Sequence, residues 1–470
     1  MDMKLFNQIE AKYDLLNTEI DGYYFWNYSR WRLADFYELR KSGGYTSGAS
    51  AKETKTSILT VLKNIKIPVK SCDMLVINHP RRVMIDGIYE CIYTDKIVEQ
   101  IGNAVVLEEP YEGSHSKPVH TPNLFYTDII GLQCYLHCVM TQVFRPKEFE
   151  RVKNEITARI NNPIKELNEV YHVEIKPDII VNEMMYGYFM YQKEYLFYKK
   201  IIKRLRPKVI LEVVSYNREC MVVNEIAKEM NIPTIELQHG IIGEEHSAYN
   251  FPQGYDIKQF PQYIFLFSEY WKNKASFPIA EAERIATGYP HLERMANRFI
   301  SYRENRAKQK TILFLSSGPI GDKLSQIAVD LKKSLDADKF RIIYKLHPKE
   351  YVTWQQDYPH LIEAGVEVID TNQINLYELF AISDVQVSGY NSTTVFEGLY
   401  FNLQTFILNY ATAVEIDDLC KKGVACYFDD ATELAALLNS DMSIDLPKNN
   451  FWQSNALENT VNEIYKIMND

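Results

Sequence analysis

The stretch that decides the fold is "PKVILEVVSYNRECMVVNEIAKEMNIPTIELQHG", residues 207–240. Its first apolar run, Val209–Val214, is typical of a strand that is covered on both faces. A polar turn follows, then Arg218–Met230 has the apolar spacing of a helix, which the tripeptide "NIP" ends. A second short apolar run, Thr234–Leu237, comes next. The order strand, helix, strand predicts a βαβ unit in a parallel sheet.

The same alternation continues on both sides of this unit. Upstream, we predict strands within Asp73–Pro80 and Ala104–Pro110 and long helices over Thr127–Val143 and Pro146–Tyr171. Further strands are predicted at Tyr263–Ser268 and Arg284–Pro290 and, after a basic helical connector at 291–310, at Thr311–Ser317, Phe340–Pro348, Val366–Asp370, Asp384–Gly389 and Thr405–Leu408. The pattern predicts an α/β protein with two Rossmann-like domains facing each other across a cleft.

Three domain ranges follow from this pattern. Residues 1–299 form an N-terminal, acceptor-side Rossmann-like domain with a helical, aromatic N-terminal extension, and residues 300–452 form a C-terminal, donor-side one. Residues 453–470 are an amphipathic helix that is expected to pack back toward the N-terminal domain. Because ligands of parallel sheets bind beyond the carboxyl ends of the strands, the informative residues should directly follow strands.

Composition narrows the class of protein. The chain has 470 residues and a net charge of −10, which argues against a broad nucleic-acid surface. Neither a signal-peptide pattern nor an apolar run long enough to span a bilayer is present, so we expect a cytoplasmic protein. Seven scattered cysteines fit reduced core thiols. "CYLHC", residues 134–138, resembles half a metal site, but no matching pair exists, which favours a buried helix.

One strand end in the first predicted domain carries an imidazole. Thr234–Leu237 is followed by Gln238, His239 and a glycine, and then by a loop that holds Glu244, Glu245 and His246. Histidine is the usual general base near neutral pH. A structural role for His239 is the alternative, and Glu244 or His246 can take the catalytic role in its place.

Two strand-end loops in the second predicted domain suggest phosphate binding. "SSGPIG" begins with Ser316, Ser317 and Gly318, whose hydroxyls and backbone N–H groups can hold phosphate oxygens. A plain turn is the alternative. "KLHP" places Lys345 and His347 at a strand end, and the following proline keeps the histidine extended. There a structural histidine is the alternative.

The segment "VSGYNSTTVFEGL", Val387–Leu399, is the most informative one. A strand ends, and Asn391, Ser392 and Thr393 open a helix, whose free N–H groups favour an anion. Glu397 follows one turn later, where a carboxylate can accept hydrogen bonds from the two hydroxyls of a ribose. An ordinary helix cap is the alternative.

Together these motifs resemble nucleotide-sugar glycosyltransferases of the GT-B type, best over residues 205–410. More narrowly, they resemble bacterial enzymes of capsule, O-antigen and teichoic-acid synthesis. "LQHG" is similar to the histidine-glycine turn of the CDP-glycerol glycerophosphotransferases, whose histidine is a candidate base. "KLHP" is similar to the donor-domain motif shared with bacterial sialyltransferases, whose histidine contacts the donor phosphate. The resemblance therefore implies roles for His239, His347, Ser392, Thr393 and Glu397.

Two departures from that group bear on the donor. The glycerophosphotransferases usually carry a tryptophan before the first histidine and an aspartate-tyrosine pair before the paired hydroxyls, whereas Gln238 and "GYN" stand here. The departures favour a sugar donor over an alditol phosphate. A CDP-alditol phosphotransferase of teichoic-acid type and a UDP-sugar 2-epimerase remain alternatives, as does a sensor that binds without turnover.

The implied function is transfer of a sugar from a CMP- or UDP-linked donor to a hydroxyl of a saccharide or lipid-linked glycan acceptor. It belongs to capsule or lipopolysaccharide synthesis and needs neither a metal nor a cofactor other than the nucleotide-sugar co-substrate. No nucleic-acid partner is expected. Peripheral contact with the inner face of the plasma membrane is compatible with such acceptors. The aromatic and arginine-rich stretch Asp21–Leu33 predicts a packing or homodimer surface, with an acceptor groove or membrane-proximal face as the alternative.

Overall fold

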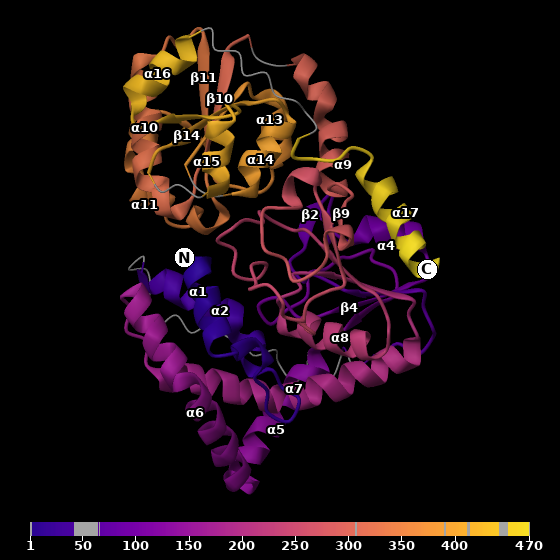
Figure 1. The fold of residues 1–470 in the computed structure, drawn as a ribbon. Helices are drawn as coiled ribbons and strands as arrows, with labels where there is room; N and C mark the ends of the chain where they lie inside the picture. The colour runs from indigo at the N-terminus through magenta and orange to yellow at the C-terminus, as the bar shows by residue number, and fades with distance from the viewer. Residues whose placement is uncertain are drawn as a thin grey trace. The chain divides into compact units, whose positions relative to one another are not determined.

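The computed structural model describes residues 2–41, 64, 66–305, 308–389, 392–410, 414–440 and 450–469 (Figure 1). The chain divides into two compact units. The first domain comprises Met1–Gly288 and Asn455–Asp470, and the second comprises Tyr289–Ser454. The division after Gly288 lies eleven residues before the end of the predicted N-terminal range, and the last helix belongs to the first domain.

The first domain contains a seven-stranded parallel sheet in the order β5-β4-β1-β6-β7-β8-β9. The strands are β1 (Met74–Ile77), β4 (Ala104–Glu108), β5 (Leu124–Tyr126), β6 (Val209–Val213), β7 (Thr234–Leu237), β8 (Tyr263–Leu266) and β9 (Arg284–Ala286). The predicted βαβ unit is confirmed, since β6 pairs in parallel with β7 and α8 (Arg218–Glu229) connects them. A small antiparallel hairpin, β2 (Val83–Ile85) with β3 (Ile88–Glu90), was not predicted.

Helices surround this sheet. They are α1 (Met3–Lys12), α2 (Phe25–Lys41), α4 (Asp95–Ile101), α5 (Asp128–Phe144), α6 (Pro146–Tyr171), α7 (Pro177–Leu205), α8 and α17 (Ala456–Asn469), with short 3-10 turns η1 (Leu15–Asn17), η2 (Glu269–Trp271) and η3 (Glu281–Glu283). Ile464 and Ile467 of α17 are buried in the core formed with β1, β4 and β6. In the N-terminal aromatic stretch, Tyr23, Trp26 and Arg30 are buried, and Arg30 pairs with Glu10 at 2.7 Å. These contacts favour the packing interpretation of that stretch.

The second domain contains a six-stranded parallel sheet in the order β12-β11-β10-β13-β14-β15. Its strands are β10 (Lys310–Leu315), β11 (Phe340–Lys345), β12 (Glu367–Ile369), β13 (Val385–Ser388), β14 (Gln404–Leu408) and β15 (Cys426–Phe428). The helices are α9 (Pro290–Phe299), η4 (Ile300–Asn305), η5 (Gly318–Ile320), α10 (Gly321–Ser334), η6 (Pro348–Glu350), α11 (Trp354–Asp357), α12 (Pro359–Glu363), α13 (Leu376–Ile382), α14 (Thr393–Tyr400), α15 (Val414–Lys421) and α16 (Ala431–Asn439).

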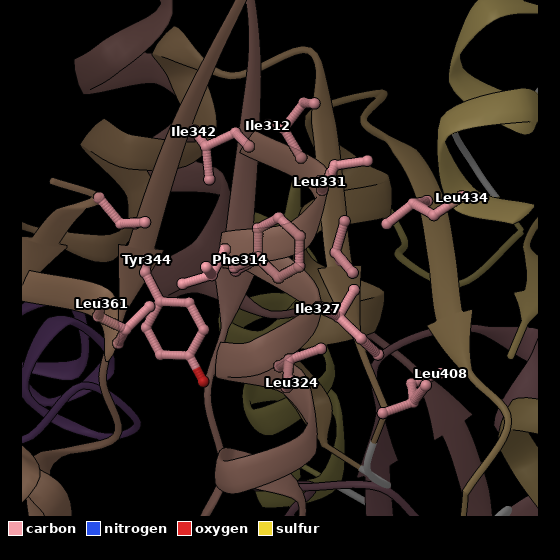
Figure 2. Packing of buried hydrophobic residues seen from close by; sticks show 14 of the residues in the cluster. Ile312, Phe314, Leu324, Ile327, Leu331, Ile342, Tyr344, Leu361, Leu408 and Leu434 are labelled. Carbon is pink, nitrogen blue, oxygen red and sulfur yellow. The ribbon is translucent and has the colours of Figure 1, made fainter. Parts of the chain in front are cut away.

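The core of the second domain lies between its sheet and the helices beside it (Figure 2). Phe314 and Tyr344 project from the paired strands β10 and β11, and Leu324 and Leu331 meet them from α10. Alternate residues of a strand point to opposite faces, which is why every second position of β10 and β11 reaches this core. The packed sheet fixes where the strand ends, and hence the loops after them, can lie.

The cysteines are all free, and five of the seven are buried. In "CYLHC", the Cys134 thiol donates to the Met190 carbonyl and His137 Nε2 lies 3.0 Å from Gln192 Oε1. Both contacts join α5 to α7 and favour the buried-helix interpretation of this motif. Among the described residues, no helix is long and apolar enough to cross a membrane.

Candidate functional site

The predicted site residues of the first domain follow β7, one strand beyond the point where the strand order of its sheet reverses. The chain passes from β1 to β4 on one side and returns to β6 on the other side of β1. Such a reversal opens a crevice at the carboxyl ends of the strands, the usual ligand position in these sheets. His239 follows β7, the next strand beyond β6, so the fold brings it to this edge.

Hydrogen bonds on both sides of His239 hold its backbone. The side chain of Gln238 is buried, accepts from the Phe267 N–H at 2.8 Å and donates to the Gly240 carbonyl at 2.9 Å. The Tyr93 hydroxyl donates to the His239 carbonyl at 3.1 Å. Gln238, which replaces a tryptophan of the resembling group, therefore serves as a bridge inside the domain.

The ring of His239 lies between a carboxyl group and a hydroxyl. Its Nε2 is 3.1 Å from the Tyr216 hydroxyl, and its Nδ1 is 3.8 Å from Glu236 Oε1. Glu236 Oε1 is itself fixed by the Ser215 N–H at 3.0 Å and the Tyr249 hydroxyl at 2.7 Å. Burial raises the pKa of Tyr216, so the phenol keeps its proton; it donates to Nε2 in one tautomer of His239 and accepts from Nε2 in the other.

Acid, imidazole and hydroxyl thus lie next to one another, but His239 Nδ1 and Glu236 Oε1 are too far apart for a hydrogen bond, and Nδ1 has no hydrogen-bond partner among the described residues. Burial, reinforced by the nearby His246 and His79, lowers the pKa of His239 to about 3, so the ring is neutral at pH 7 but is a weak base in this environment. Its side chain remains 17% exposed. A hydroxyl that replaces the Tyr216 hydroxyl at Nε2 would be placed for deprotonation.

The other predicted residues of this loop differ in position. The ring of His246 packs against Tyr216 and Tyr249, with centroids 5.6 and 4.8 Å away, and burial lowers its pKa to about 4. Glu244 is exposed and contributes to none of the contacts of the His239 ring that the structure describes. The loop thus brings His246 to the ring cluster and leaves Glu244 at the surface.

In the second domain, one buried carboxylate holds two of the predicted loops. Glu350 accepts from the Ser316 hydroxyl at 3.0 Å and from the His347 N–H at 2.7 Å. The Tyr358 hydroxyl donates to the same carboxylate at 2.9 Å. The Ser316 hydroxyl is therefore engaged within the domain, while Ser317 and Gly318 are the more exposed members of the "SSGPIG" loop.

The imidazole of His347 has a defined orientation. The Lys349 N–H donates to its Nδ1 at 3.2 Å, which makes His347 the cap of the short η6 turn. A neutral ring that accepts at Nδ1 carries its hydrogen on Nε2, which suits donation to a phosphate oxygen. Lys345 points elsewhere: it is buried, its Nζ donates to the Leu346 carbonyl and the Tyr351 hydroxyl, and burial lowers its pKa to about 8.

The predicted anion-binding helix start is α14. Ser392 caps the helix and accepts from the Thr394 N–H at 3.3 Å, and the Ser392 and Thr394 hydroxyls lie 2.7 Å apart. The structure therefore pairs Ser392 with Thr394, and Thr393 is the first helical residue. Asn391 lies outside the described residues. β13 and β10 are neighbours where the strand order of this sheet reverses, so α14 and the Ser317–Gly318 loop start at the same edge.

Glu397 is buried one turn into α14 and accepts a hydrogen bond from Tyr377. Burial raises its pKa to about 7. Gly398 lets the helix approach β13, because a Cβ there would overlap the side chain of Gln386. Gln386 in turn donates to the Val395 carbonyl at 2.8 Å. The position of Glu397 is thus fixed by packing under the helix.

Sequence reasoning missed four residues around His239. They are His79, Tyr93, Tyr216 and Glu236, and signals existed for three of them. "INHP" is a strand-end His-Pro like "KLHP", Glu236 is a charged residue inside a buried strand, and Tyr216 lies in the polar turn after β6. Tyr93 carries no such signal, because it lies in a loop and reaches His239 only through the tertiary fold.

No family model and no curated protein matches this sequence. Solved structures do match its fold. A UDP-GlcNAc 2-epimerase from Methanocaldococcus jannaschii is 11% identical, over 84% of this chain and 99% of that one, with a TM-score of 0.50. The enzyme from Neisseria meningitidis bound to UDP-GlcNAc is 12% identical over the same shares, with a TM-score of 0.51. The wall teichoic acid polymerase TagF is 13% identical over 93% and 98%, with a TM-score of 0.44. The two epimerase structures, together with the two parallel sheets, establish the predicted GT-B fold for this chain.

Proposed function

We propose that the protein is a glycosyltransferase that moves a sugar from a CMP- or UDP-linked donor to a hydroxyl of a saccharide acceptor. We further propose that the reaction belongs to bacterial capsule or lipopolysaccharide synthesis. The observation that carries the proposal is the Glu236–His239–Tyr216 arrangement. It is a buried imidazole with a carboxyl group near one nitrogen and a hydroxyl within hydrogen-bond distance of the other. An acceptor hydroxyl needs such a base.

In this proposal the second domain holds the nucleotide. His347 Nε2 and the N–H groups at the start of α14 would stabilise the departing phosphate electrostatically, in place of a metal ion. Glu397 in its ionised form would accept from the two ribose hydroxyls. Ser317 and Gly318 would supply further donors, while Ser316 and Lys345 would support the loops from inside the domain.

The chemical step would transfer the sugar from the nucleotide to the acceptor hydroxyl. The acceptor hydroxyl oxygen attacks the anomeric carbon and forms the new glycosidic bond. The bond between that carbon and the phosphate oxygen breaks, and the nucleotide leaves with the electron pair. The acceptor proton passes to His239 Nε2, the nitrogen that the Tyr216 hydroxyl contacts. His246, packed against Tyr216, would help to position that hydroxyl.

A thermal-shift panel of CMP, CDP, UDP, GDP and their sugar conjugates tests the donor half, since a nucleotide that binds the folded state raises its melting temperature. We expect His347→Ala to lose this shift. His239→Ala should keep the shift and lose about 10²- to 10⁴-fold in transfer rate, the usual contribution of a general base. His172→Asn is the matched control, because His172 is an exposed residue in a left-handed conformation that asparagine tolerates. Transfer at the parent rate in both site variants would refute the assignment.

A second candidate function is a UDP-sugar 2-epimerase, and one observation favours it. Burial and the neighbouring charge of Glu109 raise the pKa of Glu219 to about 8, and Glu109 is raised as well. Glu219 is the second residue of α8, which follows β6, and Glu109 follows β4, so both carboxyl groups lie near the same sheet edge. Incubation with UDP-GlcNAc in D₂O decides: deuterium at C2 without any acceptor identifies an epimerase. Release of CMP with transfer of glycerol phosphate would instead identify the alditol phosphotransferase.

A further inference from the structure

A His-Pro turn in the first domain has no part in the proposed transfer step. His79, Pro80 and Arg81 follow β1, and the Arg81 N–H donates to His79 Nδ1 at 3.2 Å. The His347–Pro348–Lys349 turn makes the same contact at the same distance. In each turn an imidazole, a proline and a cationic residue follow a strand of a parallel sheet.

The contact fixes which nitrogen of His79 carries hydrogen. Burial and the charge of Arg81 lower the pKa of His79, so the ring is neutral at pH 7. Because Nδ1 accepts, Nε2 must carry the hydrogen and can only donate. Among the described residues Nε2 has no hydrogen-bond partner, and the ring is partly exposed.

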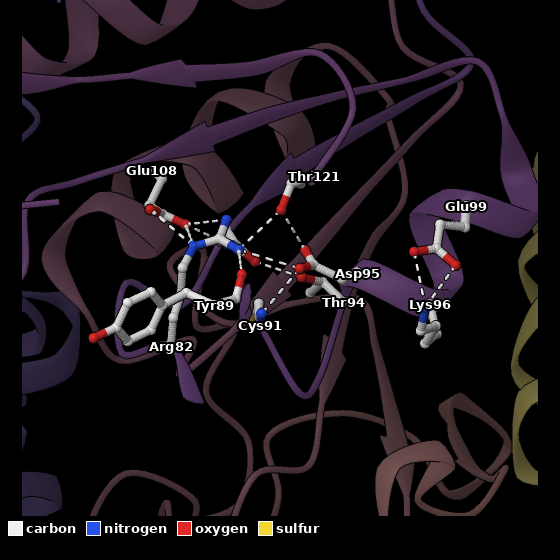
Figure 3. Close-up of polar contacts among 10 residues, drawn as sticks. Arg82, Tyr89, Cys91, Thr94, Asp95, Lys96, Glu99, Glu108 and Thr121 are labelled. Atoms are coloured by element: carbon white, nitrogen blue, oxygen red, sulfur yellow. Dashed lines mark hydrogen bonds and ion pairs between the residues drawn. The ribbon is translucent and has the colours of Figure 1, made fainter. Parts of the chain in front are cut away.

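The two adjacent arginines have different environments. Arg82 is buried and contacts Asp95 at 3.1 Å and Glu108 at 2.7 Å (Figure 3). Arg81 is exposed and pairs with none of the carboxylates that the structure describes. The cluster in Figure 3 therefore engages Arg82, and the exposed Arg81 is the next residue but one after His79.

The turn is held rigidly at both ends. Asn78 donates to Glu108 Oε2 at 2.6 Å, and Arg82 Nε donates to the same oxygen at 2.9 Å. One buried carboxylate thus fixes the residues before and after His79–Pro80–Arg81. Donors that are already in place lose little conformational entropy when a ligand binds.

The turn also lies beside the proposed base. The ring of Tyr93 packs edge-on against His79 at 5.8 Å and against His239 at 6.4 Å between centroids. Tyr93 therefore contacts both rings, which places the His79 turn near His239. Arginine and an imidazole N–H are suitable partners for phosphate oxygens.

We propose that the His79–Pro80–Arg81 turn binds a phosphate group, and that the acceptor of the reaction carries this phosphate close to the attacking hydroxyl. The identity of the ligand as an acceptor rests on the proposed function, whereas phosphate binding by the turn does not. The phosphate belongs either to a soluble sugar phosphate or to a lipid phosphate.

The test uses the full chain with His347→Ala, which removes the other His-Pro turn and needs no nucleotide. Titration with inorganic phosphate, followed by ³¹P NMR at low salt, should show one saturable site. Adding Arg81→Ala or His79→Ala should weaken this binding about tenfold or more, as expected for loss of a charged hydrogen bond. Adding Arg159→Ala, an exposed arginine on α6, should change nothing. Absence of a saturable site, or equal binding in the Arg81 and His79 variants, would overturn the proposal.

Two competitors then identify the source of the phosphate. Displacement of inorganic phosphate by glucose 1-phosphate supports a soluble phosphorylated acceptor, and displacement by farnesyl phosphate in detergent micelles supports a lipid-linked one. Failure of both competitors would overturn the assignment of this site to the acceptor. Failure of the proposed function is seen separately, as the absence of any nucleotide-induced shift in melting temperature and of sugar transfer.

Discussion

The two His-Pro turns share one local geometry and are held in place by different means. In the first domain, Glu108 fixes the flanks of the His79 turn through the side chains of Asn78 and Arg82. In the second domain, Glu350 is part of the turn itself and holds the His347 N–H and the Ser316 hydroxyl. One turn depends on a buried charge cluster assembled from distant segments, and the other on a local cap. The same imidazole orientation therefore depends on a buried ion pair in the first domain and on hydrogen bonds from neutral groups in the second.

Removing the two clamping carboxylates should therefore have unequal consequences, and this is the largest effect that we expect. Glu108→Ala leaves the buried Arg82 with Asp95 as its one carboxylate partner among the described residues, and should cost about 3 kcal/mol or more. Glu350→Ala leaves neutral donors unpaired and should cost about 1–3 kcal/mol.

Urea unfolding of the two variants measures this difference. The double variant Arg82→Ala/Glu108→Ala should lose less stability than the sum of its single variants, because the unpaired charge is removed. If Glu350→Ala proves the more destabilising of the two single variants, the expected difference between Glu108 and Glu350 is wrong.

Substitutions of two glycines in the segment that contacts Glu350 should have a smaller effect on stability. A Cβ at Gly321 would overlap the Tyr358 hydroxyl and Glu350 Oε1, so Gly321→Ala should cost about 1–3 kcal/mol through overpacking. A Cβ at Gly318 meets no atom within 4 Å. Gly318→Ala should therefore leave the melting temperature unchanged.

The same pair of variants tests the donor loop. If a nucleotide phosphate approaches the loop closely, Gly318→Ala weakens nucleotide binding without weakening the fold. Unchanged nucleotide affinity in that variant would remove Gly318 from the donor site.

The pH dependence of ligand binding separates the two domains further. The pKa of Glu397 is about 7, and only its ionised form can accept both ribose hydroxyls. Nucleotide affinity should be fully present above pH 7 and should fall about tenfold for each unit below it. His239, with a pKa of about 3, does not titrate in this range.

Calorimetric titrations between pH 5.5 and 8.5 test this expectation. Glu397→Gln should bind more weakly at pH 8 and lose the pH dependence, while Glu363→Gln, at an exposed acid, should behave as the parent does. The free energy of unfolding without nucleotide should change with pH in the opposite direction. Because folding raises the pKa of Glu397, the fold gains stability as the pH falls from 7 toward the ordinary pKa of a glutamate. A nucleotide affinity that stays constant across this range would remove Glu397 from the ribose site.

Much of the fold follows from local pattern in the sequence. The run Val209–Leu237 alternates strand, helix and strand strongly enough to predict a parallel sheet. The cap of the His347 turn also follows from local sequence, because "HPKE" places a capping acid three residues after the histidine. α7 was missed, since its 29 residues are rich in aromatic side chains and pack on several elements, which obscures a helical stripe.

Short-range periodicity and turn chemistry in the sequence were enough to predict most of the strands and the positions of His239 and His347 just after them, with Glu397 in the helix after β13. Only the tertiary structure decided what surrounds them. Tyr93, Tyr216 and Glu236 reach His239 because parallel strands that are distant in sequence end at one sheet edge. For the same reason, no local pattern could reveal that Glu108, 26 residues beyond Arg82, holds the His79 turn in place.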